Sequence, residues 1–481
     1  MSKRILIISD SVFRQTGYST VAKNIITNLD PSFKIAQLGV SHAPTPYENL
    51  EYDIDYYAPI FNHDKCCANG LVIEHYNSDT KEVEYIQPNV NLDRVDKKIC
   101  SKGTPNPGDP YSFESAYFVI QDFKPDIVLT INDIWGMYKL NFLKNRNKFK
   151  LVSYLAVDSE CFPMLIKNKE TINTMQFINQ VDKLIVFTNW AKETINTTAK
   201  LSINKEFDNI EIIPHGVDQS TYFNVNNKKE FMADFFKLNS DEVFLIGSVN
   251  RNQPRKRLDA IFQILSILVK NENPNGKKFM VHFHCAIEDS NGWDLPWLAR
   301  YYGVQDRIIL DGNLKPGSGV PDHILNLIMN SYDVHLVPTN SEGWGLSILE
   351  TMACGVPNVI SDYSAHGDWA KDSALLIKLA AKIHEPITNH IKGIIDVQHA
   401  AEQILLLYKN VKIRKKYRKK SFELANRLQW KNIGIKWNTL LQDIDLSEFS
   451  ESRYNYNLLD VNNILPFPTN PIDTEFLVQE V

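Results

Sequence analysis

Two glutamates with seven residues between them stand out in the second half of the sequence. Glu342 lies in a glycine-containing turn after an apolar run that ends at Pro338, and Glu350 follows in a segment that we expect to be helical from Leu346 to Ala353. A strand-to-helix turn directs backbone N–H groups and the positive end of the helix dipole at one point, which favours an anionic ligand. Ionised carboxylates accept hydrogen bonds from hydroxyl groups. A ligand that carries both phosphate and sugar therefore fits this segment, and the alternative is a pair of ordinary surface residues.

Two cations, Arg251 and Lys256, lie five positions apart just after the apolar run 243–249. Fixed positive charges at the end of a strand stabilise the negative charge that develops on a departing phosphate. We therefore assign Arg251 and Lys256 to the leaving group and expect neither a metal ion nor another cofactor. Because further arginines flank the pair, the alternative is a solvated basic start of a helix.

The elements that must position these residues follow from the apolar runs. Fully apolar runs of strand length that alternate with helical segments are typical of a parallel sheet covered on both faces. The series starts near the N-terminus and restarts after residue 240, which predicts an α/β protein with two tandem Rossmann-like, doubly wound parallel sheets. The first series is 4–9, 127–131, 151–157, 184–187 and 210–213, and the second is 243–249, 279–285, 308–310, 334–337 and 358–360.

Three regions follow from this alternation. We expect an N-terminal domain over residues 1–222, a second domain over 223–428, and a C-terminal helix and tail over 429–481 that returns to the first domain. Residues 60–115 fit the alternation poorly and are predicted to be an insertion. Within it, runs 71–75 and 82–86 flank a turn signal and indicate a hairpin, whereas the three prolines of 103–110 indicate a loop.

The motifs resemble those of a large family of retaining glycosyltransferases, the glycosyl transferases group 1 or family 4-like enzymes, which share a Glu-x7-Glu signature. Segment 338–357, PTNSEGWGLSILETMACGVP, resembles the signature, 212–218 is similar to the interdomain loop, and 310–312 resembles a strand end of the family. Segment 249–256, VNRNQPRK, resembles the Arg and Lys pattern of the leaving-group site. The resemblance implies the GT-B fold, in which two domains face each other across a cleft.

The resemblance also assigns roles by position. It implies that Gly345, Leu346, Ser347 and Glu350 bind the donor, with Glu342 catalytic beside them, and that Gly17 approaches the donor phosphate from the other domain.

The acceptor side departs from the family pattern. Many relatives carry a histidine just after the strand that matches 151–157, often followed by an aspartate. In this chain the histidine is absent and Asp158 remains. Asp158, and Asp133 at the preceding strand end, are candidates to orient the acceptor hydroxyl or take its proton. Either could equally be a helix N-cap.

Composition limits the remaining classes. The 481 residues carry a net charge of −5, and the apolar runs are too short to span a membrane. Scattered cysteines and the absence of a signal-like segment predict a cytoplasmic protein. Two basic runs, 139–150 and 412–420, are solvated faces or sites for nucleic acid or a membrane glycolipid. The oligomeric state is not predicted.

Taken together, the motifs predict a metal-independent hexosyl- or pentosyltransferase, and the resemblance implies that it retains the anomeric configuration. The donor would be a nucleotide-sugar, UDP- or GDP-linked, and the acceptor a hydroxyl of a glycan, a lipid or a hydroxylated base in DNA. The alternatives are a non-catalytic nucleotide-sugar-binding module and a phosphorylase or epimerase with the same GT-B fold.

Overall fold

The computed structural model gives the positions of most of the chain. It describes residues 2–40, 52–62, 71–87, 93–95, 103–105, 113–134, 140–141, 143, 145–160, 164–167, 170–173, 175, 178–226, 228–312, 314–315, 318–385 and 390–447.

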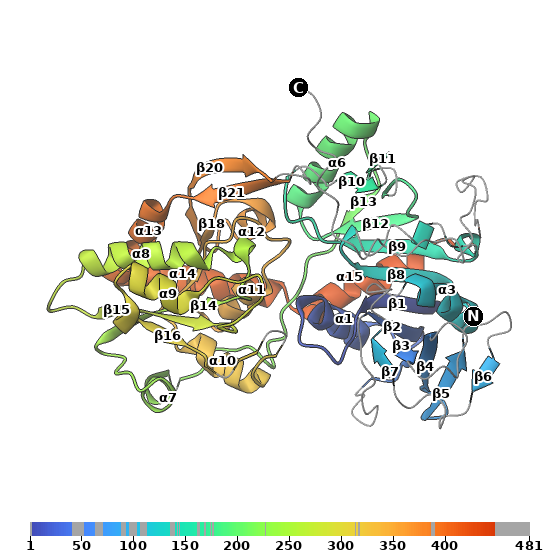
Figure 1. Ribbon diagram of the computed structural model, residues 1–481, viewed down its shortest axis with the longest axis horizontal. Coiled ribbons are helices and arrows are strands. Elements are labelled where there is room, and N and C mark those ends of the chain that lie inside the picture. Colours follow the sequence, from blue (N-terminus) through green and yellow to red (C-terminus); the bar gives the residue numbers. More distant parts are fainter. Residues whose placement is uncertain are drawn as a thin grey trace. The chain divides into compact units, whose positions relative to one another are not determined.

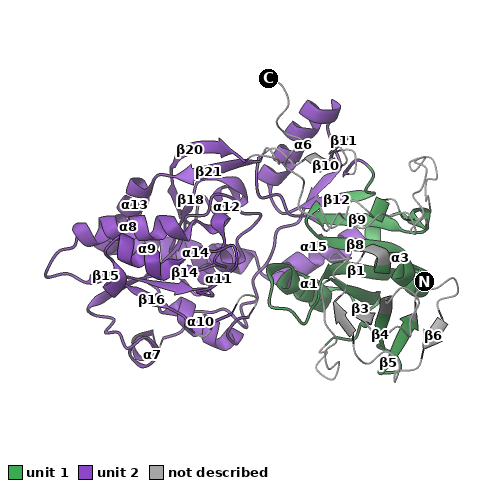
Figure 2. Ribbon diagram, viewed as in Figure 1, with its two compact units in different colours: residues 1–154, 180–183, 442–481 green, residues 155–179, 184–441 purple. Residues whose placement is uncertain are grey.

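The chain divides into two compact units, which Figure 2 shows in different colours. Unit 1 comprises residues 1–154, 180–183 and 442–481, and unit 2 comprises residues 155–179 and 184–441. The domain limits expected from the sequence, at 222 and 428, stay a prediction.

Unit 1 is built on a sheet whose centre is parallel (Figure 1). Among the strands of unit 1 the order in this sheet is β9–β8–β1–β2–β3–β4–β5–β6, and β7 pairs with β3. Ile5 of β1 lies opposite Ile35 of β2 on one side and Ile127 of β8 on the other, and all three are buried. Apolar side chains on both faces explain why these strands read as unbroken hydrophobic runs. The strand bounds are β1 Arg4–Asp10, β2 Lys34–Val40, β3 Asp55–Asn62, β4 Leu71–Asn77, β5 Glu82–Gln87, β6 Asp93–Val95, β7 Gly103–Pro105, β8 Ile127–Asn132 and β9 Lys150–Leu155.

The insertion contains the hairpin that the sequence predicts. β4 and β5 pair antiparallel, with Asn77 opposite Glu82 next to the turn. The prediction of a loop from Gly103 is wrong for the first three residues, because Gly103–Pro105 forms β7 and pairs antiparallel with β3. A proline is compatible with β7, because this strand pairs only with β3 among the described strands and so lies at an edge of the pairing. Residues 106–110 lie outside the described residues.

Two helices of unit 1 are α1, Gly17–Asn28, and α3, Phe113–Phe123. Thr16 caps α1, because its side chain accepts a hydrogen bond from the backbone N–H of Ser19. Val21, Ile25 and other apolar residues of α1 are buried, as the helical spacing of these residues requires.

Unit 2 contains a six-stranded sheet in which all neighbouring strands pair parallel, with the order β16–β15–β14–β17–β18–β19. Phe244 and Ile246 of β14 pack into one hydrophobic cluster, whereas Val243 and Leu245 pack into another. Since alternate residues of a strand point to opposite faces, helices cover both faces of this sheet. The strands are β14 Val243–Val249, β15 Lys278–His284, β16 Ile308–Leu310, β17 Val334–Val337, β18 Asn358–Ser361 and β19 Leu375–Ile377.

Unit 2 contains further strands and helices, which precede, alternate with or follow the six strands in the chain (Figure 1). The remaining strands are β10 Met164–Lys167, β11 Glu170–Asn173, β12 Lys183–Val186, β13 Ile210–Ile212, β20 Leu379–His384 and β21 Ile391–Ile395. The helices are α6 Asn189–Ile203, α7 Lys228–Phe235, α8 Leu258–Lys270, α9 Leu295–Tyr301, α10 Asp322–Asn330, α11 Leu346–Ala353, α12 Ser364–Trp369, α13 Val397–Lys409, α14 Val411–Arg427 and α15 Trp430–Asp443.

Among the described residues, no helix has both the length and the apolar character needed to cross a membrane.

Candidate functional site

The turn between β17 and α11 forms as the sequence predicts. α11 spans Leu346–Ala353, and Gly345 before it has a φ of 88°, a conformation that favours glycine. A Cβ atom at Gly345 would come within 2.7 Å of Cδ1 of Ile348. Gly345 has no side chain to cap the first N–H groups of α11, which include those of Leu346 and Ser347, so these groups are suited to an anion.

Glu342 is the centre of a buried charge cluster just before this helix. Its carboxylate forms an ion pair with the Lys256 ammonium and accepts a hydrogen bond from Nη1 of Arg255 at 3.2 Å. Burial alone would raise the pKa of Glu342, but the charges of Lys256 and Arg255 outweigh burial and lower this pKa to about 2. The carboxylate is therefore ionised at neutral pH, between two cations.

The backbone of the two loops fixes this cluster. Lys256 ends a short 3-10 helix, Pro254–Lys256, whose Arg255 carbonyl accepts hydrogen bonds from Oγ1 of Thr339 at 2.7 Å and from the Asn340 N–H at 2.9 Å. The N–H of Glu342 donates to Oγ of Ser364 at 2.9 Å. The ends of β14 and β17 are thereby joined, which brings together charges 86 residues apart in the sequence.

Arg251, which the sequence analysis groups with Lys256, forms its ion pair with Asp289 rather than with Glu342. Its Nε donates to Oδ2 of Asp289 at 2.8 Å, and its side chain is 56% exposed, against 13% for Lys256. Arg255, which the sequence treats only as a flanking residue, takes the second place beside Glu342. The assignment of Arg251 and Lys256 to the leaving group stays a prediction, and Arg255 is a further cation at the same place.

Asp158 lies beside a cation that the sequence reasoning missed. Nζ of Lys392 donates to Oγ of Ser159 at 2.7 Å and to Oγ of Ser341 at 2.9 Å, and it lies 3.8 Å from Oδ2 of Asp158. Burial alone would raise the pKa of Asp158, but the charges of Lys392 and Arg255 lower it. Asp158 therefore belongs to the same charge cluster as Glu342.

Lys392 comes from the β20–β21 hairpin, which the sequence analysis did not anticipate. The hairpin reaches Asp158's segment through the Ile391 N–H, which donates to the Glu160 carbonyl at 3.0 Å. Lys392 is buried in β21, whose sequence is IKGII. A single lysine within such an apolar strand was the one available signal that its side chain has a buried partner.

Glu350, in α11, has a different environment from Glu342. Burial raises the pKa of Glu350 to about 8, and the nearby Asp322 carboxylate adds to the shift. At neutral pH this carboxyl group therefore holds a proton, whereas the sequence analysis treats it as an ionised acceptor. A protonated carboxyl can both donate and accept a hydrogen bond.

The candidates of unit 1 form a separate set. Gly17 is the first residue of α1, and Asp133 follows β8 and accepts a hydrogen bond from the Tyr18 hydroxyl at 2.5 Å. In the basic run, Arg146 is 2% exposed and bonded to Oδ2 of Asp182 at 2.8 Å. The prediction that this run is a solvated or ligand-binding face is wrong for Arg146, because its partners are internal. Lys144 lies outside the described residues.

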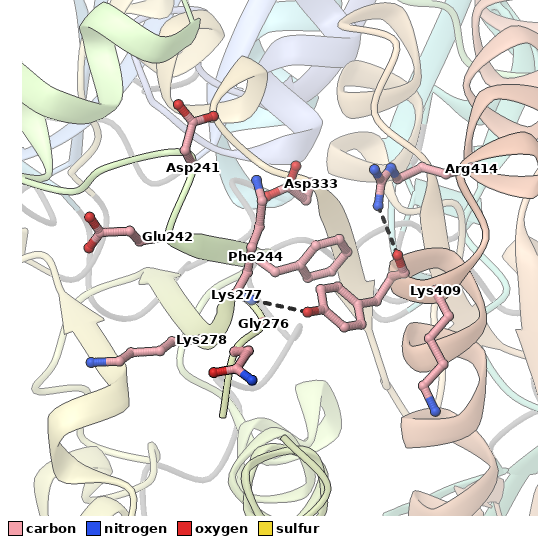
Figure 3. Close-up of a pocket in the computed structure, with 11 residues that line it drawn as sticks. Asp241, Glu242, Phe244, Gly276, Lys277, Lys278, Asp333, Lys409 and Arg414 are labelled. Atoms are coloured by element: carbon pink, nitrogen blue, oxygen red, sulfur yellow. Dashed lines mark hydrogen bonds between the residues drawn. The ribbon is translucent and has the colours of Figure 1, made fainter. Parts of the chain in front are cut away.

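A hollow of about 630 Å³ lies at the amino ends of the unit 2 strands, the end opposite to the Glu342 cluster (Figure 3). It lies where β14 and β15 begin, and its lining mixes both signs of charge, with Glu242 and Asp333 as well as Lys277 and Lys278. Ligands of open parallel sheets bind at the carboxyl ends of the strands. The charge cluster around Glu342 lies at that end, so it is the better candidate site.

Residues 230–424 match the sequence model of the family described as glycosyl transferases group 1. The match covers less than half of the 481 residues and includes both Glu342 and Glu350. The family prediction made from the segment that holds Glu342 and Glu350 is thereby confirmed.

One characterised relative is D-inositol 3-phosphate glycosyltransferase from Stackebrandtia nassauensis, which is 26% identical over 231 residues. That match spans 47% of each of the two chains, so the chain spans about half the length of this relative.

Two solved structures are similar over 92% of the chain. Sucrose-phosphate synthase from Thermosynechococcus elongatus has a TM-score of 0.60 at 14% identity, with 98% of its own chain covered. HepE from Anabaena, in complex with UDP and glucose, has a TM-score of 0.60 at 12% identity, with 100% of its own chain covered. These similarities confirm the predicted α/β fold of the GT-B type.

Proposed function

We infer that this protein is a glycosyltransferase that moves a sugar from a nucleotide-sugar donor to a hydroxyl acceptor. The observation that carries this proposal is the buried cluster of Glu342 with Lys256 and Arg255 at the start of α11. Two cations share one carboxylate, so the cluster retains a positive charge next to helix N–H groups. A diphosphate would complete the neutralisation of this charge.

The cluster also supports departure of the nucleotide without a metal ion. As the bond to the sugar breaks, negative charge grows on the diphosphate, and fixed cations stabilise that charge without any reorganisation of solvent. Lys256 and Arg255 supply these charges, and Arg251 adds a third, more exposed cation at the same strand end. The family match over residues 230–424 supports retention of the anomeric configuration.

The donor is proposed to be a UDP- or GDP-sugar. The similar structure of HepE contains UDP and glucose, which supports the first of these. Glu342 and Glu350 are proposed to bind hydroxyl groups of the donor, with Gly345, Leu346 and Ser347 at its phosphates and Gly17 as a further contact.

The acceptor side is proposed to use Asp158, with Asp133 as a second candidate. The lowered pKa of Asp158 keeps its carboxylate ionised, so it can accept a hydrogen bond or a proton from an acceptor hydroxyl. The class of acceptor stays open between a glycan, a lipid and a hydroxylated base in DNA. Exposed lysines of α14, Lys412 and Lys416 among them, would favour a polyanionic or membrane-bound acceptor.

A donor screen tests the proposal. The protein is incubated with UDP- and GDP-sugars and a panel of acceptors in EDTA, and nucleoside diphosphate release and product anomers are followed by NMR. We expect transfer with the donor's anomeric configuration kept. Binding without turnover would point to a binding module, consumption of inorganic phosphate to a phosphorylase, and an inverted product would contradict retention.

A further inference from the structure

Two histidines and an aspartate meet at the carboxyl ends of β15 and β16 in unit 2. Oδ1 of Asp311 lies 3.0 Å from Nε2 of His282, and Oδ2 of the same carboxylate contacts Nδ1 of His284. Each of the three residues offers one ligand atom, and these three ligand atoms lie within 4.8 Å of one another. His282 is fully buried, and the side chains of His284 and Asp311 are 9% and 17% exposed.

The sequence builds this group through strand periodicity. His282 and His284 are two residues apart in β15, so their side chains point to the same face of the sheet. β16 runs parallel beside β15 with Phe283 opposite Leu310, so Asp311 emerges from β16 at the level where β15 ends. The group therefore rests on two adjacent strands of the sheet rather than on mobile surface side chains.

Tyr332 supports the deepest of the three side chains from behind. Its hydroxyl lies 2.8 Å from Nδ1 of His282, the ring nitrogen that faces away from Asp311. The Tyr332 ring lies against Gly247, where a Cβ atom would come within 2.1 Å of it. A hydroxyl behind the outer nitrogen of a histidine fixes the ring's orientation and tautomer, as the partners of metal-binding histidines do.

We propose that His282, His284 and Asp311 bind a divalent transition-metal ion, with Zn²⁺ the preferred one. Two imidazoles and one carboxylate are a donor set that zinc takes in proteins, with bonds of about 2.0–2.2 Å and a fourth position left for water. One carboxylate beside two neutral imidazoles leaves the bound ion's charge only partly compensated, which suits a water ligand.

The proposed ion joins the ends of β15 and β16, and the proposal gives it no role in sugar transfer. The proposed metal site does not depend on the charge cluster around Glu342. The zinc test can therefore fail without affecting the proposed glycosyltransferase activity, and the reverse also holds. The same three side chains can satisfy one another by hydrogen bonds alone, and this arrangement is the outcome that the test must separate from a metal site.

Metal retention by the full chain tests the proposal. The protein is stripped with EDTA, exposed to Zn²⁺, passed through a desalting column and analysed for zinc by mass spectrometry. We expect about one zinc per chain in the wild type and in His323→Gln, a control at an exposed histidine of α10. His284→Gln and Asp311→Asn should retain none. Equal retention by these two variants, or none by the wild type, overturns the proposal.

A graded variant separates a metal site from a packing role. Tyr332→Phe keeps the ring but removes the hydroxyl behind His282, so it should weaken zinc affinity about 10- to 100-fold, as loss of such a partner does. Affinity is measured by competition with a chromophoric chelator, and the visible spectrum of the Co²⁺-loaded protein reports the coordination. An unchanged zinc affinity in Tyr332→Phe would mean that His282 does not hold the zinc, and a Co²⁺ spectrum like that of the aqueous ion would mean that these side chains hold no ion. Either result contradicts the proposal.

Discussion

Two basic segments of the chain look alike in sequence but use their cations differently. In unit 1, Arg146 donates to the carbonyls of Phe149 and Gln180 and to Asp182, which also accepts the N–H of Leu151. In unit 2, Lys256 and its neighbour Arg255 converge on one carboxylate at the end of the sheet.

The difference lies in what a ligand can replace. Two backbone carbonyls and the Asp182 carboxylate accept the hydrogen bonds of Arg146, so its charge is already neutralised within the fold. The carboxylate of Glu342 balances only part of the charge of two cations, and a diphosphate can enter such a cluster. A basic run therefore indicates a ligand site only when the partners of its cations are known.

The largest expected effect is a loss of stability when Arg146 of unit 1 is replaced. Arg146→Met should lower the free energy of unfolding by about 3–5 kcal/mol, because it leaves the mostly buried Asp182 carboxylate without its cation. Urea unfolding measures this loss. Lys148→Met, at an exposed residue of the same run, is the matched control and should be neutral. Similar stabilities for the two variants would contradict the structural role of Arg146.

On the unit 2 side, the effect should appear in activity rather than in stability. Lys256→Met is expected to reduce kcat about 100- to 1000-fold, the usual effect of removing one electrostatic group from a transition state. Lys278→Met, at the amino end of β15 and away from the cluster, is the control and should retain wild-type turnover. Near-normal turnover in Lys256→Met would contradict the assignment of the Glu342 cluster to the leaving group.

Glu350 offers a test of pH dependence. Its pKa of about 8 in the folded protein lies above the ordinary value of 4.5, so the folded state holds a proton that the unfolded state loses between these values. Wild-type stability therefore falls as pH rises through this window, by up to about 1.4 kcal/mol per pH unit from this group.

Glu350→Gln has no such proton to lose. The stability of this variant relative to the wild type should rise between pH 5.5 and pH 7.5, values chosen inside the window. Urea unfolding at the two pH values measures it. Parallel pH profiles for variant and wild type would mean that burial does not perturb this carboxyl group.

Lys392 should have a smaller effect, because it acts through Asp158. We expect Lys392→Met to lower kcat about 10- to 100-fold, the effect of losing charge-assisted hydrogen bonds. The pH profile should move upward as the pKa of Asp158 rises. Lys392→Arg should recover part of the activity, and Lys382→Met, on the same hairpin but half exposed, is the control. An unshifted pH profile in Lys392→Met would limit the residue to a packing role.

The strands and the α11 segment were predictable because each is encoded locally. An apolar run fixes β14 and β17 to the residue, and the glycine turn fixes the start of α11 at Leu346. Lys256 and Glu342 could be named for the same reason, since each follows such a run directly.

The remaining features depend on contacts between distant segments. Whether Arg251 or Arg255 faces Glu342 is decided by the 3-10 helix that Thr339 and Asn340 hold in place, and no local pattern encodes that choice. The burial of Lys392 depends on a hairpin that meets the chain more than 200 residues away, at Ser159. Sequence periodicity describes single helices and strands, and it does not predict contacts between distant segments.

Calorimetric titration of UDP and GDP in EDTA tests the central claim, that the Glu342 cluster binds a nucleoside diphosphate with the chain's own cations. The wild type and the Lys278→Met control should bind at least one of the two nucleotides. In Lys256→Met the Kd should rise at least about 10-fold, since a hydrogen bond to a charged group is lost. Equal affinity in Lys256→Met, or wild-type binding that requires Mg²⁺ or Mn²⁺, would contradict the account.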